Sequence, residues 1–214
     1  MTVSYPDGVE EIVRLQDYDH IFAIPGLYEE VVQRRLKCAS PSHIAQKLLQ
    51  GVTSVDMKAS ELHVLDVGAG NGLSGQELRR IGVGTVIGLD VSEIARLAAE
   101  RDRPGVYEEY IVADMATPDL IPDLIQRYKL NTVTCAGALG HLPVDDFARR
   151  VWSEFPKGSW ISAGVFDVPG TENKIIASYK TTGLFEIISC ERFRHRQTMA
   201  GEPIYNLALL ARRS

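Results

Sequence analysis

The sequence predicts an α/β protein whose sheet is mostly parallel, extended at its end by an antiparallel hairpin and preceded by helices. From residue 62 onward, short apolar runs alternate with amphipathic stretches, as in consecutive β–α–β units. After Gly183 this alternation stops, and two strand-like runs, 184–193 and 203–211, flank a polar turn. The first pattern indicates a parallel sheet, and the second indicates an antiparallel hairpin.

Between residues 62 and 166 each element is justified by its own periodicity. The apolar runs have the length of buried strands, and the stretches between them repeat apolar residues at helical spacing. We expect strands at 62–67, 84–90, 106–112, 130–137 and 158–166, and helices near 73–81, 92–102, 117–128 and 144–155.

The first sixty residues are expected to be helical. Apolar residues recur there at helical spacing in two stripes, separated by Pro-Gly and Ser-Pro-Ser breaks. We therefore divide the chain into a helical cap or lid at 1–60 and an α/β domain at 61–214. The two stripes are Tyr28, Val31, Val32 and Leu36, and Ile44, Ala45, Leu48 and Leu49.

Length, composition and charge are those of an ordinary folded protein of 214 residues, with 45% hydrophobic and 24% charged residues. The net charge of −5 would repel a phosphate backbone, so a nucleic-acid partner is disfavoured. One basic stretch alternates with Phe193, which predicts the solvent-exposed face of a strand. That stretch comprises Arg192, Arg194, His195 and Arg196.

The cysteines and the N-terminus show no pattern of secretion, metal binding or membrane insertion. Cys38, Cys135 and Cys190 include no Cys-x-x-Cys pair and no nearby histidine at metal-ligand spacing, so we expect reduced thiols and no metal. Residues 1–19 lack the apolar core of a signal peptide, and no run of eighteen apolar residues occurs. These features predict a cytoplasmic protein.

A glycine-rich turn after the strand expected at 62–67 is the strongest functional motif in the chain. Alternate glycines let the backbone approach a ligand more closely than larger residues allow. The helix that follows points its free N–H groups and the positive end of its dipole at the same place, which suits a carboxylate. The expected ligand-binding residues of this turn are Gly68, Ala69, Gly70, Gly72 and Leu73.

Three acids near the ends of consecutive predicted strands suit the other parts of a nucleoside ligand. Asp66, before the glycines, is placed to hold an ammonium group directly or through water. Asp90, followed by Val91, is placed to accept both ribose hydroxyls. Asp114 is placed to accept an adenine amino group, and the thioether of Met115 offers a polarizable face to the ring.

Residues 70–75 also satisfy the dinucleotide pattern G-x-G-x-x-G, so an NAD-binding protein is an alternative. Two features favour S-adenosylmethionine (SAM): Asp66 lies two residues before the first glycine, and the chain ends in a hairpin rather than a second nucleotide-binding half. The chain also lacks the Tyr-x-x-x-Lys pair of short-chain dehydrogenases.

In order and spacing, the glycine turn, Asp90 and Asp114 resemble the class I SAM-dependent methyltransferase family over about residues 61–166. The resemblance implies a Rossmann-like, seven-stranded, mostly parallel sheet with an antiparallel last strand, N-terminal lid helices, SAM as cofactor and S-adenosylhomocysteine (SAH) as product. It is closest to the small methyltransferase-like proteins of the Williams–Beuren syndrome region, through residues 18–22, 66–75 and 135–142. It also favours Tyr18 as a cofactor contact.

The exit of the fourth strand of the sheet is the expected place of the reaction, because the small residues Ala136 and Gly137 leave room for the methionine arm and its methyl group. His141 follows and is the candidate general base, since a histidine of ordinary pKa suits proton removal from a hydroxyl or ammonium acceptor. The alternative is a histidine that lines the pocket or begins a helix ahead of Pro143.

Motifs that the chain lacks narrow the range of possible methyl acceptors. The fourth strand lacks the Asn/Asp-Pro-Pro-Tyr/Phe motif of amino-methyltransferases, the chain has no Pro-Cys pair for attack on cytosine, and no acid pair follows the fourth and fifth strands to bind magnesium. We therefore expect metal-independent methylation of a small molecule at O, N, S or C. A SAM-binding sensor or partner subunit without catalysis is the other alternative, because fold alone does not establish activity.

Overall fold

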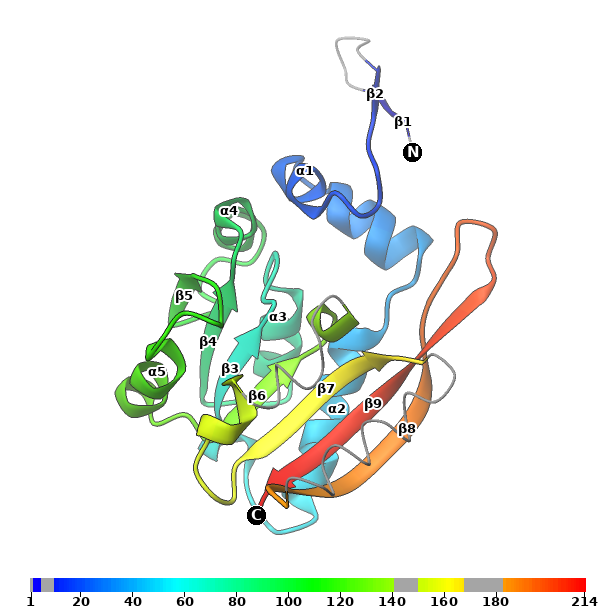
Figure 1. The fold of residues 1–214 in the computed structure, drawn as a ribbon. Helices are drawn as coiled ribbons and strands as arrows, with labels where there is room; N and C mark the ends of the chain where they lie inside the picture. Colours follow the sequence, from blue (N-terminus) through cyan, green and yellow to red (C-terminus); the bar gives the residue numbers. More distant parts are fainter. Residues whose placement is uncertain (1, 5–9, 141–149, 168–182) are drawn as a thin grey trace.

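The computed structural model describes residues 2–4, 10–140, 150–167 and 183–214, and a seven-stranded sheet forms its centre (Figure 1). The strands are β3 (His63–Val67), β4 (Thr85–Asp90), β5 (Glu109–Val112), β6 (Thr132–Cys135), β7 (Trp160–Phe166), β8 (Phe185–Gln197) and β9 (Pro203–Arg213). Their order is β5-β4-β3-β6-β7-β9-β8. Neighbours from β5 to β7 are parallel, whereas β9 pairs antiparallel with β7 and β8. The predicted fold class is confirmed.

Strand β3 lies at the centre of the sheet, and the chain reverses direction across it. The chain runs outward from β3 through β4 to β5, returns to β6 on the other side, and continues outward to β7. In open α/β sheets, ligands bind outside the carboxyl ends of the strands at such a reversal. The crevice beyond β3 and β6 is therefore where the topology places a ligand.

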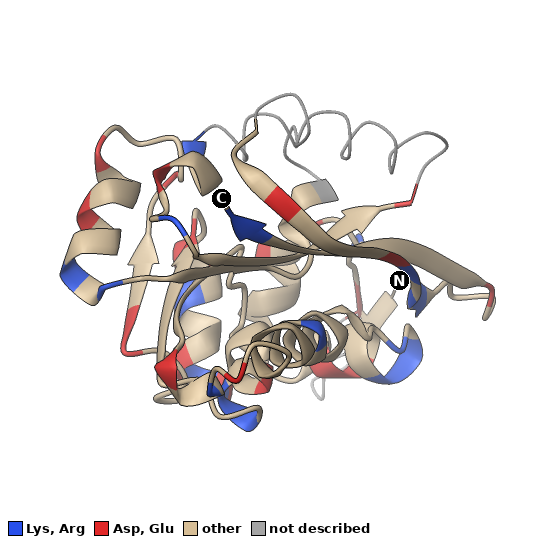
Figure 2. Ribbon diagram, turned by 90° about the horizontal axis from the view of Figure 1, so that it is seen from below, with Lys and Arg blue, Asp and Glu red and all other residues tan. Residues whose placement is uncertain are grey.

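Helices pack on both faces of the sheet, as Figure 2 shows with the sheet seen close to edge-on. Leu65 of β3 lies in a core with Leu124, whereas Val64 lies in a separate core with Leu48 and Leu78. Successive residues of a strand point to opposite faces, so β3 contributes to both cores. The helices are α2 (Ser40–Thr53), α3 (Leu73–Arg80), α4 (Glu93–Asp102) and α5 (Leu120–Tyr128).

Helix α2 covers one face of the sheet, whereas the sequence analysis placed it in a lid. Its Leu48 and Val52 pack with Trp160 of β7 and Leu210 of β9. The Ser162 hydroxyl also donates a hydrogen bond of 2.9 Å to a carbonyl of α2. The amphipathic stripe correctly predicts a helix, but its period does not say which surface it covers. The division of the chain at residue 60 stays a prediction.

The N-terminal region contains strands as well as helices, which differs from the all-helical expectation. Strands β1 (Thr2–Ser4) and β2 (Glu10–Ile12) pair antiparallel, and Figure 1 shows them extending away from the sheet. Their β-branched residues favour extended backbone. Helix α1 (Tyr18–Ala23) and a π-helical segment (Glu29–Arg35) follow.

Only the C-terminal part of the helix predicted at 144–155 lies in the described ranges. Residues 141–149 lie outside the described ranges, and Trp152–Glu154 form a single 3₁₀ turn. Trp152 and Phe155 are both buried in the core, and Phe155 is extended because proline follows it. The proline therefore limits the helical run on its C-terminal side.

Two further observations concern the charged residues and the hydropathy of the helices. In the view of Figure 2, segments that carry Lys and Arg are interspersed along the ribbon with segments that carry Asp and Glu. Within the described ranges, no helix is long and apolar enough to span a membrane.

Candidate active site

The turn after β3 has the left-handed backbone that its alternate glycines predict. Gly68, Gly70 and Gly72 have φ angles of +72°, +53° and +86°, a region that favours glycine. A Cβ added to Gly68 would stand 2.5 Å from the Cβ of Ala138. Helix α3 then begins at Leu73 without a side-chain cap, so its first N–H groups are available to a ligand.

We expect Gly68→Ala to destabilise the protein more than alanine at another left-handed glycine. Gly26 has φ +74° but nothing within 4 Å of an added Cβ, so Gly26→Ala is a control for backbone strain alone. The contact with Ala138 should cost Gly68→Ala about 1–3 kcal/mol more in unfolding free energy. Denaturant titration of both variants measures the difference. Equal losses, or no recovery on adding Ala138→Gly, would contradict the packing argument.

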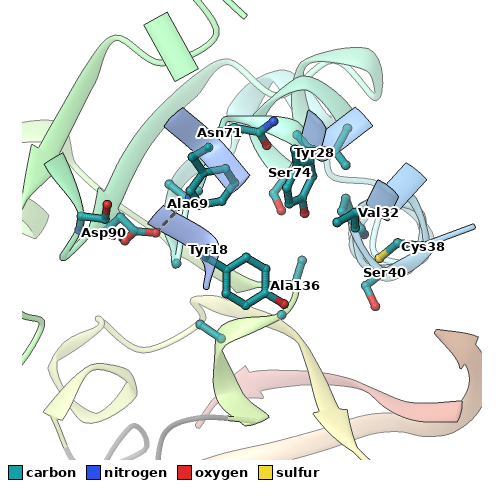
Figure 3. Close-up of a pocket in the computed structure, with 18 of the residues that line it drawn as sticks. Tyr18, Tyr28, Val32, Cys38, Ser40, Ala69, Asn71, Ser74, Asp90 and Ala136 are labelled. Carbon is teal, nitrogen blue, oxygen red and sulfur yellow. Dashed lines mark hydrogen bonds between the residues drawn. The ribbon is translucent and has the colours of Figure 1, made fainter. Parts of the chain in front are cut away.

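A cavity of about 530 Å³ opens beside the glycine turn, at the carboxyl ends of β3, β4 and β6 (Figure 3). Its volume is within the range of small-molecule sites. The N-terminal helices, the loop before α2 and the end of β8 complete its wall. The predicted site residues that line it are Tyr18, Gly68, Ala69, Gly70, Leu73, Asp90, Val91, Ala136 and Gly137.

Asp90 is held rigidly at the edge of the cavity. Its carboxylate accepts hydrogen bonds from the backbone N–H of Gly70 at 2.9 Å and of Ser92 at 3.1 Å. Each carboxylate oxygen can accept a further hydrogen bond, so the group can still bind two vicinal hydroxyls. Val91 beside it is 70% exposed and offers an apolar surface for a flat ring.

Asp66 lies behind the glycine turn and is fully buried, so it does not line the cavity. Its carboxyl group accepts hydrogen bonds of 2.9 Å from the hydroxyls of Tyr107 and Thr134. Burial raises the pKa of Asp66 to about 7. The Tyr107 hydroxyl also lies 3.3 Å from the Ala69 carbonyl oxygen, so this network supports the turn from beneath. Direct binding of a ligand by Asp66 stays a prediction.

The other predicted residues do not contribute to the cavity wall as described. Gly72 is the N-cap of α3, and Met115 packs against the core beside α5. Asp114 is exposed and accepts a hydrogen bond of 2.8 Å from the Ala116 N–H, one strand beyond Asp90. His141 lies outside the described residues. Cofactor roles for Asp114 and Met115, and a base role for His141, stay predictions.

The N-terminal segments are attached directly to the glycine turn. Glu29 accepts hydrogen bonds from the Asn71 amide at 3.0 Å and pairs with Arg103 at 2.9 Å. Arg103 in turn donates to the Asn71 carbonyl at 3.0 Å. The ring of Phe22 comes within 3.2 Å of the position that a Cβ on Gly70 would occupy. These contacts hold the N-terminal elements against the turn.

The end of β8 supplies two cavity residues that the sequence analysis assigned to a solvent-exposed face. His195 and Arg196 line the cavity, so that prediction was wrong for them. Arg192 and Arg194 do face outward, where Arg192 pairs with Asp167 at 2.5 Å. His195 and Arg196 are adjacent in the sequence, which breaks the strict alternation of a strand. This adjacency is the sequence feature that distinguishes them from Arg192 and Arg194.

Residues 64–155 match the model of a family described as a methyltransferase domain. That range contains the glycine turn, Asp90 and the exit of β6. The chain has no match among curated proteins.

Solved structures of methyltransferases have the same fold. A SAM-dependent methyltransferase from Anabaena variabilis is 13% identical, with TM-score 0.63, over 95% of this chain and 96% of that one. The Synechocystis magnesium protoporphyrin IX methyltransferase with bound SAM is 18% identical, with TM-score 0.62, over 95% and 100%. The Burkholderia thailandensis 1,6-didemethyltoxoflavin-N1-methyltransferase, solved with 1,6-didemethyltoxoflavin and SAH, is 15% identical, with TM-score 0.62, over 100% and 94%.

Proposed function

We propose that this chain, a SAM-dependent methyltransferase, methylates a small organic acceptor without a metal. One observation carries the proposal: a single cavity joins the glycine turn and Asp90 to a second end lined by Tyr18, Ser40 and Arg196. Figure 3 shows Asp90 and Ser40 on opposite sides of the cavity, with Tyr18 between them. A cofactor at the first end would leave the second end for an acceptor.

The residues at the first end fit SAM. Asp90 would accept the ribose hydroxyls, and the first turn of α3 would bind the methionine carboxylate. A Cβ on Gly137 would meet nothing within 4 Å, so the exit of β6 leaves open space beside the turn. When bound, SAM supplies an electrophilic methyl group on its sulfonium.

The contribution of the chain to the reaction is chiefly positioning. Bringing a nucleophile into line with the methyl group removes much of the entropic barrier. The Glu29–Arg103 pair and Phe22 hold the N-terminal helices against the turn, at the edge of the cavity where the reacting atoms would lie. His141, which follows the exit of β6, would remove a proton from an acceptor that arrives protonated.

Four finer predictions belong to this proposal. Kinship with the small Williams–Beuren syndrome region proteins rests on residues 18–22, 66–75 and 135–142. A cytoplasmic location stays a prediction, and a small-molecule acceptor rather than nucleic acid rests on the net charge of −5. A lid formed by N-terminal elements rests on the contacts of Glu29 and Phe22 with the turn.

We expect the purified chain to bind SAM and SAH with micromolar dissociation constants, about 8 kcal/mol, and to bind NAD much more weakly. Calorimetry measures the affinities, and thermal shift reports them independently because a ligand that binds only the folded state raises its stability. Tighter binding of NAD than of SAH would contradict the cofactor assignment. A chain that binds SAH but transfers no methyl group to any small acceptor would favour the sensor alternative.

A further inference from the structure

We propose that Ser40, His195 and Arg196 form the acceptor end of the cavity and that the acceptor is a small organic carboxylate with an apolar body. The inference rests on the proposed function, because it assigns the end of the same cavity that the cofactor residues leave free. It names a chemical class of acceptor that the fold does not specify.

A β-bulge is the reason that His195 and Arg196 both reach the cavity. In β8, Arg194 pairs with Tyr205 and Arg196 with Ile204, so His195 is the extra residue. Adjacent residues of a regular strand point to opposite faces. A bulge bends the strand and redirects its side chains, and bulges are common beside active sites. Here it places an imidazole and a guanidinium side by side on one wall.

Main-chain hydrogen bonds hold this bulged end of β8 against the loop that precedes α2. The Ala39 N–H donates to the His195 carbonyl at 2.8 Å, and the Gln197 N–H donates to the Leu36 carbonyl at 2.7 Å. Ser40 is 1% exposed, and its hydroxyl lies 2.6 Å from Nδ1 of His195. Hydrogen bonds to the backbone carbonyl and to the ring of His195 therefore set the orientation of its imidazole.

His195 is neutral at physiological pH and presents one free ring nitrogen. Burial, together with the smaller effect of the Arg196 charge, lowers the pKa of His195 to about 4. Nδ1 is engaged by Ser40, whereas Nε2 has no hydrogen-bond partner within the described ranges. A neutral imidazole held in this way can form one directional hydrogen bond with a ligand in either tautomer.

Arg196 brings a positive charge to this end of the cavity. Burial raises the pKa of Tyr18 and of Cys38, and the positive charge of Arg196 opposes both shifts. Among the residues that the structure describes, no carboxylate forms an ion pair with Arg196. The planar guanidinium matches a carboxylate with two parallel hydrogen bonds. An anionic acceptor would supply the missing partner.

The rest of this end is apolar and aromatic, which specifies the body of the acceptor. Tyr18, Val32 and Leu36 line the wall between the glycine turn and the loop before α2. The acids that line the cavity, Asp19 and Asp90, both hydrogen-bond Ser92 at the other end. The charged side chains of the cavity are thus separated: the two acids lie beside the ribose site, and Arg196 lies where the acceptor would bind.

The test uses Arg196→Gln in the full chain, with Arg194→Gln as its matched control, because Arg194 is exposed and bonds Gln197 at 2.7 Å instead of lining the cavity. Benzoate with benzamide, and cinnamate with cinnamamide, are titrated by calorimetry in the presence of saturating SAH. We expect the parent to prefer each carboxylate over its amide, and Arg196→Gln to weaken carboxylate binding about 10- to 100-fold. Arg194→Gln should preserve the preference, and both variants should bind SAH as the parent does.

Two results would overturn the proposal. Equal binding of carboxylates and amides by the parent would remove the anionic acceptor, and an equally large loss of SAH affinity in Arg196→Gln would assign Arg196 to the cofactor's own carboxylate. Histidine NMR gives a second readout: the ring signal of His195 should shift when benzoate is added to the parent, and Arg196→Gln should need about 10- to 100-fold more benzoate for the same shift. Failure of the parent to bind SAH would instead reject the proposed function, and the carboxylate preference can still be measured without SAH.

Discussion

Asp90→Ala should weaken SAH binding by about 2–4 kcal/mol while the chain remains folded. The carboxylate is held by the N–H groups of Gly70 and Ser92, so it is already oriented toward the ribose site. Its removal takes away charge-assisted hydrogen bonds to two hydroxyls in a half-buried position. Calorimetry with SAH measures the loss, and circular dichroism checks the fold. Unchanged SAH affinity in a folded variant would show that Asp90 does not bind the ribose.

A double comparison separates ligand contact from loosening of the turn, since Asp90 also orders Gly70. The parent should bind SAH more tightly than a 2′,3′-dideoxy analogue of SAH. Asp90→Ala should show no such preference if the lost interaction is with the hydroxyls. A preference that survives in the variant would assign the loss to the turn.

His141→Ala should lower turnover by a factor of about 10²–10⁴ and leave SAH affinity nearly unchanged, if His141 removes the acceptor's proton. Binding and chemistry would then separate in one variant, because a base acts on the acceptor rather than on the cofactor. Steady-state methyl transfer and SAH calorimetry supply the two quantities. His63→Asn is the control for loss of a histidine, since His63 begins β3 at the end opposite the glycine turn.

The alternative role of His141 predicts the reverse pattern. A histidine that only lines the methionine pocket should weaken SAH binding on removal and change turnover modestly. Unchanged turnover with unchanged affinity would point to an acceptor that is already nucleophilic, for which alignment with the sulfonium is sufficient. Either result would reject the base hypothesis for His141.

Local sequence was enough to predict the strands and helices in their order along the chain, and the glycine turn that follows β3. Gly68, Gly70 and Gly72 all have left-handed backbone, which favours glycine, so their spacing predicts the turn before any packing is known. The terminal hairpin was predictable in the same way, because a break in β–α alternation and a polar turn are properties of neighbouring residues. Asp90 follows from its place at the end of β4.

Burial was not predictable from those patterns. Asp66 and Asp90 both belong to strands of the sheet, yet Asp66 is fully buried under Tyr107 and Thr134 while Asp90 faces the cavity. The amphipathic stripe of α2 predicts a helix equally well for a lid and for a layer on the sheet. Which of the two is formed depends on apolar surfaces contributed by β7 and β9, more than a hundred residues later in the chain.

Thus the sequence by itself determined the fold class, the glycine turn and the acid beside it, since each depends on conformational preferences of adjacent residues. Only the tertiary structure decided what faces the second end of the cavity. Ser40 and His195 are 155 positions apart and meet at 2.6 Å because β8 is an edge strand that bulges at His195 and pairs through its backbone with the loop before α2. Strict alternation along β8 places Arg196 on the face of the exposed Arg192 and Arg194, and a single inserted residue in the ladder brings it to the cavity wall beside His195.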